Sequence, residues 1–154
     1  MNYYLATWKP ENGDYTTEDY EIMRKEFREK NTVHTSWRIR SKVKKENSKV
    51  ILLRQGKVTG IFGFGFITNV LRSEELHYKN HYEIQFNNLR DSSGAPLISK
   101  NDLIAEGVPE SLLNSESSGN GVVEENVINL IDNLCIKLLA HTLSDLCTQK
   151  CLKW

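Results

Sequence analysis

The stretch that most constrains the fold is residues 50–68, which reads VILLRQGKVTGIFGFGFIT. Two hydrophobic segments flank a polar turn, the pattern of two paired strands. The second segment carries glycines at Gly60, Gly63 and Gly65, where a strand prefers large side chains. A dinucleotide-binding loop requires a helix after its glycines, whereas here a β-branched and aromatic strand continues. Glycines inside a strand mark a bulge, a tight corner or a close approach of another group, so we expect a small, strongly curved barrel.

The remaining segments predict an α+β chain of one domain. Residues 2–8, 33–40 and 82–86 have strand-like patterns, which gives a sheet of five or so strands. Tyr20, Met23 and Phe27 recur at helical spacing within residues 16–30, and Thr16 or Thr17 caps that helix. We therefore expect a barrel core with one helix in residues 1–110 and a Ser- and Gly-rich loop in residues 111–121. Residues 122–152 then form a long C-terminal helix or two shorter ones.

Composition excludes several classes of protein. Lys and Arg balance Asp and Glu at 20 each, so an anionic partner must meet a local basic patch and not a uniformly basic surface. Three cysteines without a Cys-x-x-Cys spacing suit reduced thiols. The N-terminus lacks the order of a signal peptide, and no apolar run reaches the length of about 18 residues that a membrane span requires. We expect a soluble, cytoplasmic protein without a membrane partner.

The order of several short motifs carries a resemblance. TSWRIRSK (residues 35–42), VILLRQG (50–56), GIFGFGFIT (60–68) and HYEIQFNNL (81–89) together resemble the EVE and YTH members of the PUA-like superfamily. YYLATWKP (3–10) is similar to their first strand, and SSGNGVVEENVINLI (117–131) to a loop and helix of the same modules. The similarity is greatest to the EVE-like modules at the N-terminus of modification-dependent restriction endonucleases. Two departures are Glu46-Asn47-Ser48, where relatives commonly have Gly-Asp, and the tail beyond Leu139, which has no counterpart.

The resemblance implies a PUA-like barrel whose aromatic cage accepts a flipped, methylated base of DNA. Such a base requires aromatic faces beside it and hydrogen bonds at its edge. By match to the Trp-containing segment, Trp37 is the first cage residue. The expected base-binding residues are Trp37, Trp8, Tyr82, Tyr78 and Ser36. The alternative for each tryptophan is burial in the core with its N–H satisfied.

Basic and polar residues beside this segment are candidates for the nucleic-acid backbone. Alternation along a strand places Arg38, Arg40 and Lys42 on one face, next to Trp37. A lysine-protected strand edge is the alternative. Arg54 and Gln55 lie in the expected hairpin turn, and Ser118 and Asn120 precede the C-terminal helical segment, where a flexible linker is the alternative. The expected backbone-binding residues are Arg38, Arg40, Lys42, Lys44, Arg54, Gln55, Ser118 and Asn120.

Motifs of catalysis are absent from the sequence, so we expect no enzyme activity and no cofactor. His77 and His81 have the spacing of a metal-binding pair, but the glutamate of His-Glu-x-x-His is missing. The expected partner is DNA with a modified base, together with a nuclease or motor domain or subunit of a restriction system. The alternatives are an RNA-binding or protein-interaction domain that uses an apolar patch in residues 136–152, and a small-molecule-binding barrel.

Overall fold

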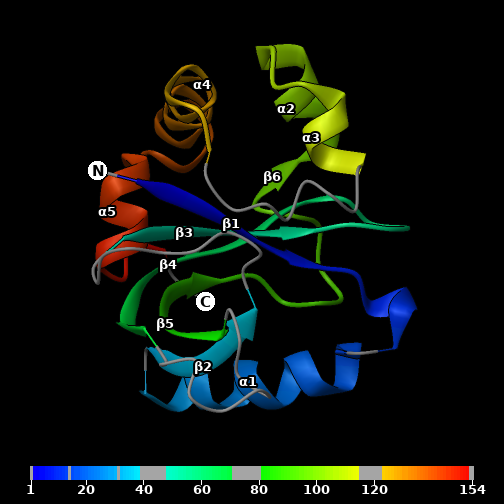
Figure 1. Cartoon of the computed structure of the whole chain (residues 1–154), viewed down its shortest axis with the longest axis vertical. Helices are drawn as coiled ribbons and strands as arrows, with labels where there is room; N and C mark the ends of the chain where they lie inside the picture. Colours follow the sequence, from blue (N-terminus) through cyan, green and yellow to red (C-terminus); the bar gives the residue numbers. More distant parts are fainter. Residues whose placement is uncertain are drawn as a thin grey trace.

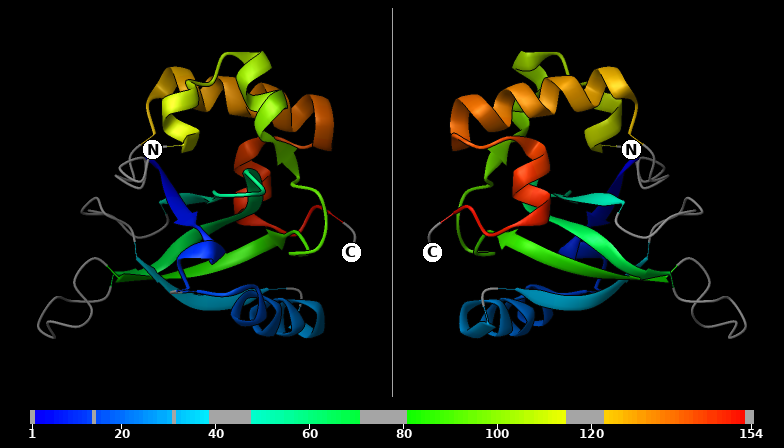
Figure 2. Two further views of the ribbon diagram at one scale, coloured as in Figure 1. Left: turned by 90° about the vertical axis from the view of Figure 1, so that its right-hand side faces the viewer. Right: turned by 90° about the vertical axis from the view of Figure 1, so that its left-hand side faces the viewer.

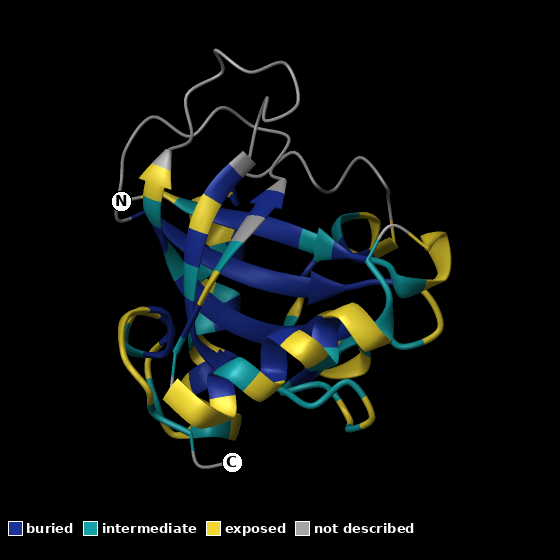
Figure 3. Cartoon of the chain, turned by 90° about the horizontal axis from the view of Figure 1, so that it is seen from below, coloured by how far each residue is buried: buried dark blue, intermediate teal, exposed yellow. Residues whose placement is uncertain are grey.

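The computed structural model describes residues 2–13, 15–30, 32–38, 48–70, 81–114 and 123–152. A six-stranded mixed sheet forms the centre of an α+β fold (Figure 1). Helix α1 (Thr17–Lys30) covers one face of the sheet (Figure 2). The other face carries α2 (Lys100–Glu106), α3 (Glu110–Asn114), α4 (Glu125–Leu134) and α5 (Leu143–Thr148). Each face therefore has its own hydrophobic core, and the strands between the two are largely buried (Figure 3).

The strand order confirms the hairpin that the glycine-containing stretch predicts. The strands are β1 (Tyr3–Trp8), β2 (Val33–Arg38), β3 (Lys49–Arg54), β4 (Gly60–Val70), β5 (His81–Leu89) and β6 (Ile98–Ser99). Their order is β1-β3-β4-β5-β2, and β6 also pairs with β4. β1 and β3 are parallel, whereas the other pairs are antiparallel. Residues 39–40 of the predicted second strand lie outside the described residues.

The glycines of β4 make room for the neighbouring strands. A Cβ atom at Gly65 would lie 2.2 Å from the carbonyl oxygen of Gln85, which is backbone and has no free space to move into. At Gly63 a Cβ atom would lie 2.7 Å from Cδ2 of Leu89. The pairing register of β4 and β5 shifts between Phe64 and Gly65, which is a bulge that bends the strand. Close approach and curvature are therefore both present, as the glycines predict.

The two outer strands of the sheet, β1 and β2, approach each other through a side chain. Nε1 of Trp37 in β2 donates a hydrogen bond to the carbonyl oxygen of Thr7 in β1, at 3.2 Å. Within the described ranges these strands share no ladder, so the sheet is not closed there. The α+β class is confirmed, whereas closure into a barrel stays a prediction.

Helix α1 begins at the predicted residues and is anchored by polar contacts. Oγ1 of Thr16 accepts from the backbone N of Asp19 at 3.2 Å, and Oδ2 of Asp19 accepts from the backbone N of Thr16 at 3.0 Å, a reciprocal cap. At the sheet, the Tyr20 hydroxyl donates to the carbonyl of Arg90, and Arg24 donates to that of Leu89 at 3.1 Å. These bonds attach the helix to the end of β5.

The C-terminal segment folds back on the sheet as two helices, not as one long helix. A π-helical turn, η4 (Cys135–Leu139), follows α4, and Ala140 ends it with a φ of 60°. Helix α5 then packs on the sheet, where Asn87 Nδ2 donates to the carbonyl of Cys147 at 2.8 Å. Asn88 is buried and binds both α5 and the residues after it, so β5 supplies the polar attachment for the C-terminal segment.

The predicted division at residues 110 and 111 is wrong in two respects. Helix α2 lies within the region that was expected to contain only one helix, and residues 111–114 of the predicted loop belong to α3. Ser99 caps α2 by accepting from the N of Asp102, and Gly107 ends it with a φ of 106°. No helix in the part of the chain that the structure describes is long and apolar enough to cross a membrane.

Candidate functional site

An aromatic cluster fills the space between α1, the sheet and the two outer strands. We use this name for Trp8, Tyr15, Tyr20, Trp37, Phe62 and Phe86. The rings of Trp8 and Tyr20 stack with centroids 4.3 Å apart and planes 11° apart. Tyr15 lies edge-on to both tryptophans, with centroid distances of 6.5 Å to Trp8 and 4.9 Å to Trp37. The structure therefore brings the two predicted cage tryptophans together around a tyrosine that the sequence did not single out.

Trp37 is the member of the cluster that lies at the open side of the sheet. Its exposed fraction is 8%, and its ring meets Phe86 edge-on at 6.1 Å. Trp37 stands opposite Tyr82 in the register of β2 and β5. Trp37 is therefore largely buried in the core beneath the sheet, and Tyr15 and Phe86 each meet its ring edge-on.

Trp8 is a core residue in this conformation. It is 2% exposed, Tyr20 stacks on its ring, and the guanidinium carbon of Arg54 lies 4.7 Å from its ring centroid. Its Nε1 donates to the carbonyl of Tyr15 at 2.8 Å. Tyr82 is also buried, at 3% exposure. A base meets neither ring without rearrangement of the cluster, so Tyr15 and Trp37 are the cluster members with the largest exposed fractions.

Arg54 packs against the aromatic cluster and does not lie in an exposed turn. The residue is 6% exposed, with its guanidinium carbon 5.1 Å from the ring of Phe62, and its Nη1 donates to the carbonyl of Ser92 at 2.9 Å. Its Nε has no hydrogen-bond partner among the described residues. Burial lowers the pKa of the guanidinium, while the charge of Glu11 opposes that shift. As a contact for a nucleic-acid phosphate, Arg54 is therefore wrongly placed in this conformation.

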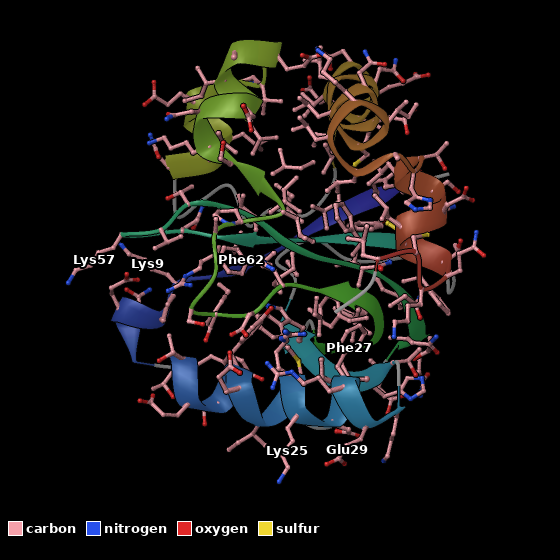
Figure 4. All side chains as sticks on the ribbon, turned by 180° about the vertical axis from the view of Figure 1, so that it is seen from behind. Lys9, Lys25, Phe27, Glu29, Lys57 and Phe62 are labelled. Atoms are coloured by element: carbon pink, nitrogen blue, oxygen red, sulfur yellow. The ribbon has the colours of Figure 1, made fainter. Side chains whose placement is uncertain are left out.

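Gln55 points away from Arg54, to the opposite face of the sheet. Its Nε2 donates to the carbonyl of Leu113 in α3 at 3.2 Å, and the residue is 7% exposed. It borders a cavity of about 220 Å³ at the β3–β4 turn. The cavity is lined by Lys9, Gln55, Gly56, Thr59, Lys100, Leu113 and Asn114. Figure 4 shows Lys9 and Lys57 close together at one side of the molecule, whereas Phe27 lies between the sheet and α1.

The lysines of this cavity were missed because they lie far apart in the sequence. Lys9 follows β1, and Lys100 begins α2. Only the return of the chain through β6 beside β4 brings α2 to the β3–β4 turn, where the N of Lys100 donates to the carbonyl of Thr59 at 3.2 Å. A pattern within one strand or helix therefore contains no signal for the pair.

Several predicted site residues lie outside the described residues. They are Tyr78, Arg40, Lys42, Lys44, Ser118 and Asn120. Ser36 and Arg38 lie in β2, but their side chains are not described. The register pairs Arg38 with His81 and Val70 with Tyr82, so the last residues of β2 and β4 and the first of β5 lie together at one end of the sheet.

Titratable groups of the described residues give no sign of a metal centre. No three His, Cys, Asp or Glu side chains gather there in a way that could hold a metal ion. His77 lies outside the described residues, and the side chain of His81 is not described. The three cysteines are free, and burial raises the pKa of the Cys135 thiol to about 12, with a further contribution from the charge of Asp132. The buried thiols of Cys135 and Cys147 therefore lack the lowered pKa that favours a reactive thiolate.

Comparison with protein-family models, with curated proteins and with solved structures finds no match for this chain.

Proposed function

We propose that the protein is a modified-nucleobase-binding module that accepts a flipped methylated base of DNA beside Trp37. The observation that carries the proposal is the position of Trp37, a residue that is 8% exposed and whose indole N–H connects the two outer strands. Its N–H is bound to the carbonyl of Thr7, so the ring is held in a fixed orientation. A fixed aromatic face at an opening of the sheet is what a base out of its stack requires.

Tyr15 occupies the place beside Trp37 that a base would take. Its hydroxyl makes only long contacts, at 3.4 Å to the carbonyl of Asp19 and 3.8 Å to Sδ of Met23. Its backbone is held firmly, because its carbonyl accepts from Nε1 of Trp8 at 2.8 Å. Rotation of the Tyr15 side chain would therefore clear space beside Trp37 while the backbone of the segment keeps its place.

Stacking on Trp37 contributes about 1–3 kcal/mol for one base. Burial of the added methyl group contributes roughly 0.8 kcal/mol, so the preference for the modified base is smaller than the effect of the ring itself. Loss of Trp37 is therefore expected to weaken binding more than loss of the methyl group does.

The sequence that follows Trp37 supplies positive charge for the DNA backbone. Arg38, Arg40, Lys42, Lys44 and Lys45 fall within eight residues, and Glu46 is the first acidic residue after them. Lys49 lies in β3 and is only 5% exposed, so it does not contribute. Such charge gives salt-dependent binding without sequence preference. In the restriction system that the resemblance implies, this module selects the modified site and a nuclease or motor subunit acts on it.

The test is binding of short DNA duplexes that carry N6-methyladenine, 5-methylcytosine, 5-hydroxymethylcytosine or no modification. Wild type is expected to bind one modified duplex several-fold more tightly than the unmodified one. Trp37→Ala is expected to lose that preference and to keep a weak, salt-sensitive background. Equal binding of all duplexes by a folded wild-type protein contradicts the proposal.

A matched control is Trp8→Phe, which changes the other tryptophan of the same cluster. Trp8 lies in the core, so this substitution is expected to lower the free energy of unfolding and to leave the preference for the modified base intact. Trp37→Phe keeps an aromatic face but loses the bond to Thr7, so a weakened preference is expected. Urea unfolding of each variant separates loss of binding from loss of folding.

A protein-interaction domain is the second candidate, favoured by one observation. Ile136 and Leu138 of the π-helical turn are exposed at 51% and 45%, within the region that was expected to carry an apolar patch in such a domain. Equal binding of all duplexes, together with a concentration-dependent change in mass that Ile136→Ser removes, would favour this function over base recognition.

A further inference from the structure

The cavity at the β3–β4 turn is built from four separate parts of the chain. Lys9 comes from the end of β1, Gln55 to Thr59 from the turn, Lys100 from the start of α2, and Asn114 from the end of α3. Its volume is about 220 Å³. Pockets for drug-sized ligands run from about 300 to 1,000 Å³, so this cavity suits a smaller group.

The two lysines that line the cavity keep hydrogen-bond donors to spare. The ammonium group of Lys9 makes no hydrogen bond or ion pair with any residue that the structure describes, whereas its backbone carbonyl accepts from the N of Asn12 at 3.0 Å. Nζ of Lys100 donates to Oδ1 of Asn114 at 2.9 Å and lies 3.7 Å from Oε1 of Glu110. An ammonium has three N–H donors, so Lys100 keeps at least one and Lys9 keeps all of its own.

Three acceptors that line the cavity each already accept a hydrogen bond. The carbonyl of Leu113 accepts from Gln55, the carbonyl of Gly56 accepts from the Thr59 hydroxyl at 3.1 Å, and Oδ1 of Asn114 accepts from Lys100. Two carboxylates border the site: Glu110 is largely exposed, with 62% of its side chain accessible, and Glu11 accepts from the backbone N of Lys57 at 3.1 Å beside Gly56. A small site with free ammonium donors and filled acceptors favours a compact anion over a cation or an apolar group.

We propose that this cavity binds a phosphate group, with Lys9 and Lys100 as its two cationic contacts. The phosphate is either one of a nucleic-acid backbone or that of a free phosphate ester, and the same two ammonium groups recognise both. The site lies on the opposite face of the sheet from the aromatic cluster, because Gln55 and Arg54 point to opposite faces. The proposal therefore goes beyond base recognition and does not depend on it.

The first test is titration of the ¹⁵N-labelled protein with inorganic phosphate at constant ionic strength. Saturable shifts are expected at the amides of Gly56, Thr59 and Lys100. Lys9→Gln and Lys100→Gln are each expected to weaken this binding several-fold. Lys25→Gln is the matched control, because Lys25 is an exposed lysine of α1 that points away from the sheet (Figure 4). Absence of saturable shifts, or an equal loss in Lys25→Gln, overturns the proposal.

A second experiment identifies the source of the phosphate. If the source is a nucleic-acid backbone, an oligonucleotide binds far more tightly than a nucleoside 5′-monophosphate. The slope of log K against log salt is negative, and each lysine substitution then makes it less steep by about 0.9 on a duplex. If the source is a free ester, the monophosphate binds at least as tightly as the oligonucleotide.

These results are distinguishable from those of the base-recognition proposal. Lys9→Gln is expected to weaken binding of modified and unmodified duplexes by the same factor. Trp37→Phe is expected to leave the phosphate titration unchanged. If Trp37→Phe abolishes the shifts at Gly56 while the protein stays folded, the phosphate site is not the separate one described above and the proposal fails.

Discussion

Asn88 is expected to be the polar side chain on which the C-terminal segment most depends. It is 0% exposed, and all four of its hydrogen-bonding positions are used. Nδ2 donates to the carbonyls of Leu146 and Gln149 at 2.7 and 2.8 Å. Oδ1 accepts from the backbone N of Cys151 and of Leu152, both at 3.1 Å. One side chain of β5 thus satisfies four backbone groups at the end of α5 and in the residues after it.

The expected cost of Asn88→Ala follows from these four bonds. Each contributes about 0.5–1.5 kcal/mol, which gives roughly 2–6 kcal/mol in all. Cys151 and Leu152 lie near the end of the chain, and their amides regain hydrogen bonds to water if the tail detaches. We therefore expect the free energy of unfolding to fall by about 3 kcal/mol. Most of this loss comes from the buried carbonyl of Leu146, which loses its donor, and from the space that the shortened side chain leaves.

The assay is urea unfolding combined with amide hydrogen exchange. Asn88→Ala is expected to lower the free energy of unfolding by about 3 kcal/mol and to remove protection from the amides of Cys151 and Leu152. Thr148→Ala is the control, because its exposed hydroxyl bonds only within α5, to the carbonyl of Ser144 at 2.9 Å. A loss below about 1 kcal/mol in Asn88→Ala, with unchanged exchange of the tail amides, would refute the reasoning.

The isosteric substitution Asn88→Asp is expected to make the stability of this region depend on pH. Asn88→Asp replaces the donating Nδ2 with an oxygen that faces the carbonyls of Leu146 and Gln149. Burial among these acceptors raises the pKa of the new carboxyl in the folded protein, so its contribution is present at low pH and is lost as pH rises. We expect the deficit of Asn88→Asp relative to wild type to be smaller at pH 4 than at pH 7.

Three further predictions concern the sheet, α1 and the buried thiols. Gly65→Ala is expected to lose about 1–3 kcal/mol in urea unfolding, because its Cβ would lie 2.2 Å from the backbone oxygen of Gln85; wild-type stability in this variant contradicts the close approach. Tyr20→Phe is expected to cost about 1 kcal/mol from the lost bond to Arg90, and a double mutant with Arg24→Met tests whether the two anchors of α1 are coupled. Burial raises the pKa of Cys135 from 9.0 to about 12, so the stability it contributes is present below pH 9.0 and is lost as pH rises to about 12. Cys135→Ala is expected to lessen the decline of stability in that range by up to about 1.4 kcal/mol per pH unit, and an unchanged pH profile contradicts this.

Local patterns predicted β1 to β5 and α1, but not β6, because the predicted elements depend on residues close in sequence. The alternation in residues 82–86 and the spacing of Tyr20, Met23 and Phe27 each reflect one buried face. The continuous hydrophobic run of residues 50–54 reflects a strand that is buried on both faces. The glycines of β4 were informative for the same reason, since a strand that lacks side chains at Gly63 and Gly65 has to meet something close. Their partner in β5 was not predictable, because strand order does not follow from local pattern.

The short helices α2 and α3 were missed although one of them has clear end signals. Ser99 and Gly107 are an ordinary cap and stop, but the helix between them has only seven residues and one buried side chain, Leu103. So short a helix shows almost no periodicity, and its stability comes from packing against α4 and β6. The cavity lysines were missed for the same reason, since Lys100 reaches the β3–β4 turn only through that packing.

The two tryptophans illustrate why a binding site and a core are hard to separate by sequence. Each indole N–H donates to a backbone carbonyl, Trp8 to Tyr15 at 2.8 Å and Trp37 to Thr7 at 3.2 Å. Both rings therefore stabilise the fold, and Trp37 also connects β2 to β1 at the side where the sheet is open. It follows that loss of binding in Trp37→Ala has no meaning without the unfolding curve of the same variant.

Tyr15→Ala is more informative, because it removes the ring beside Trp37 and leaves the backbone carbonyl that Trp8 binds. If Tyr15 stands in for a base, this variant binds the modified duplex more tightly than wild type does; weaker binding by a folded variant means that Tyr15 is itself a wall of the site.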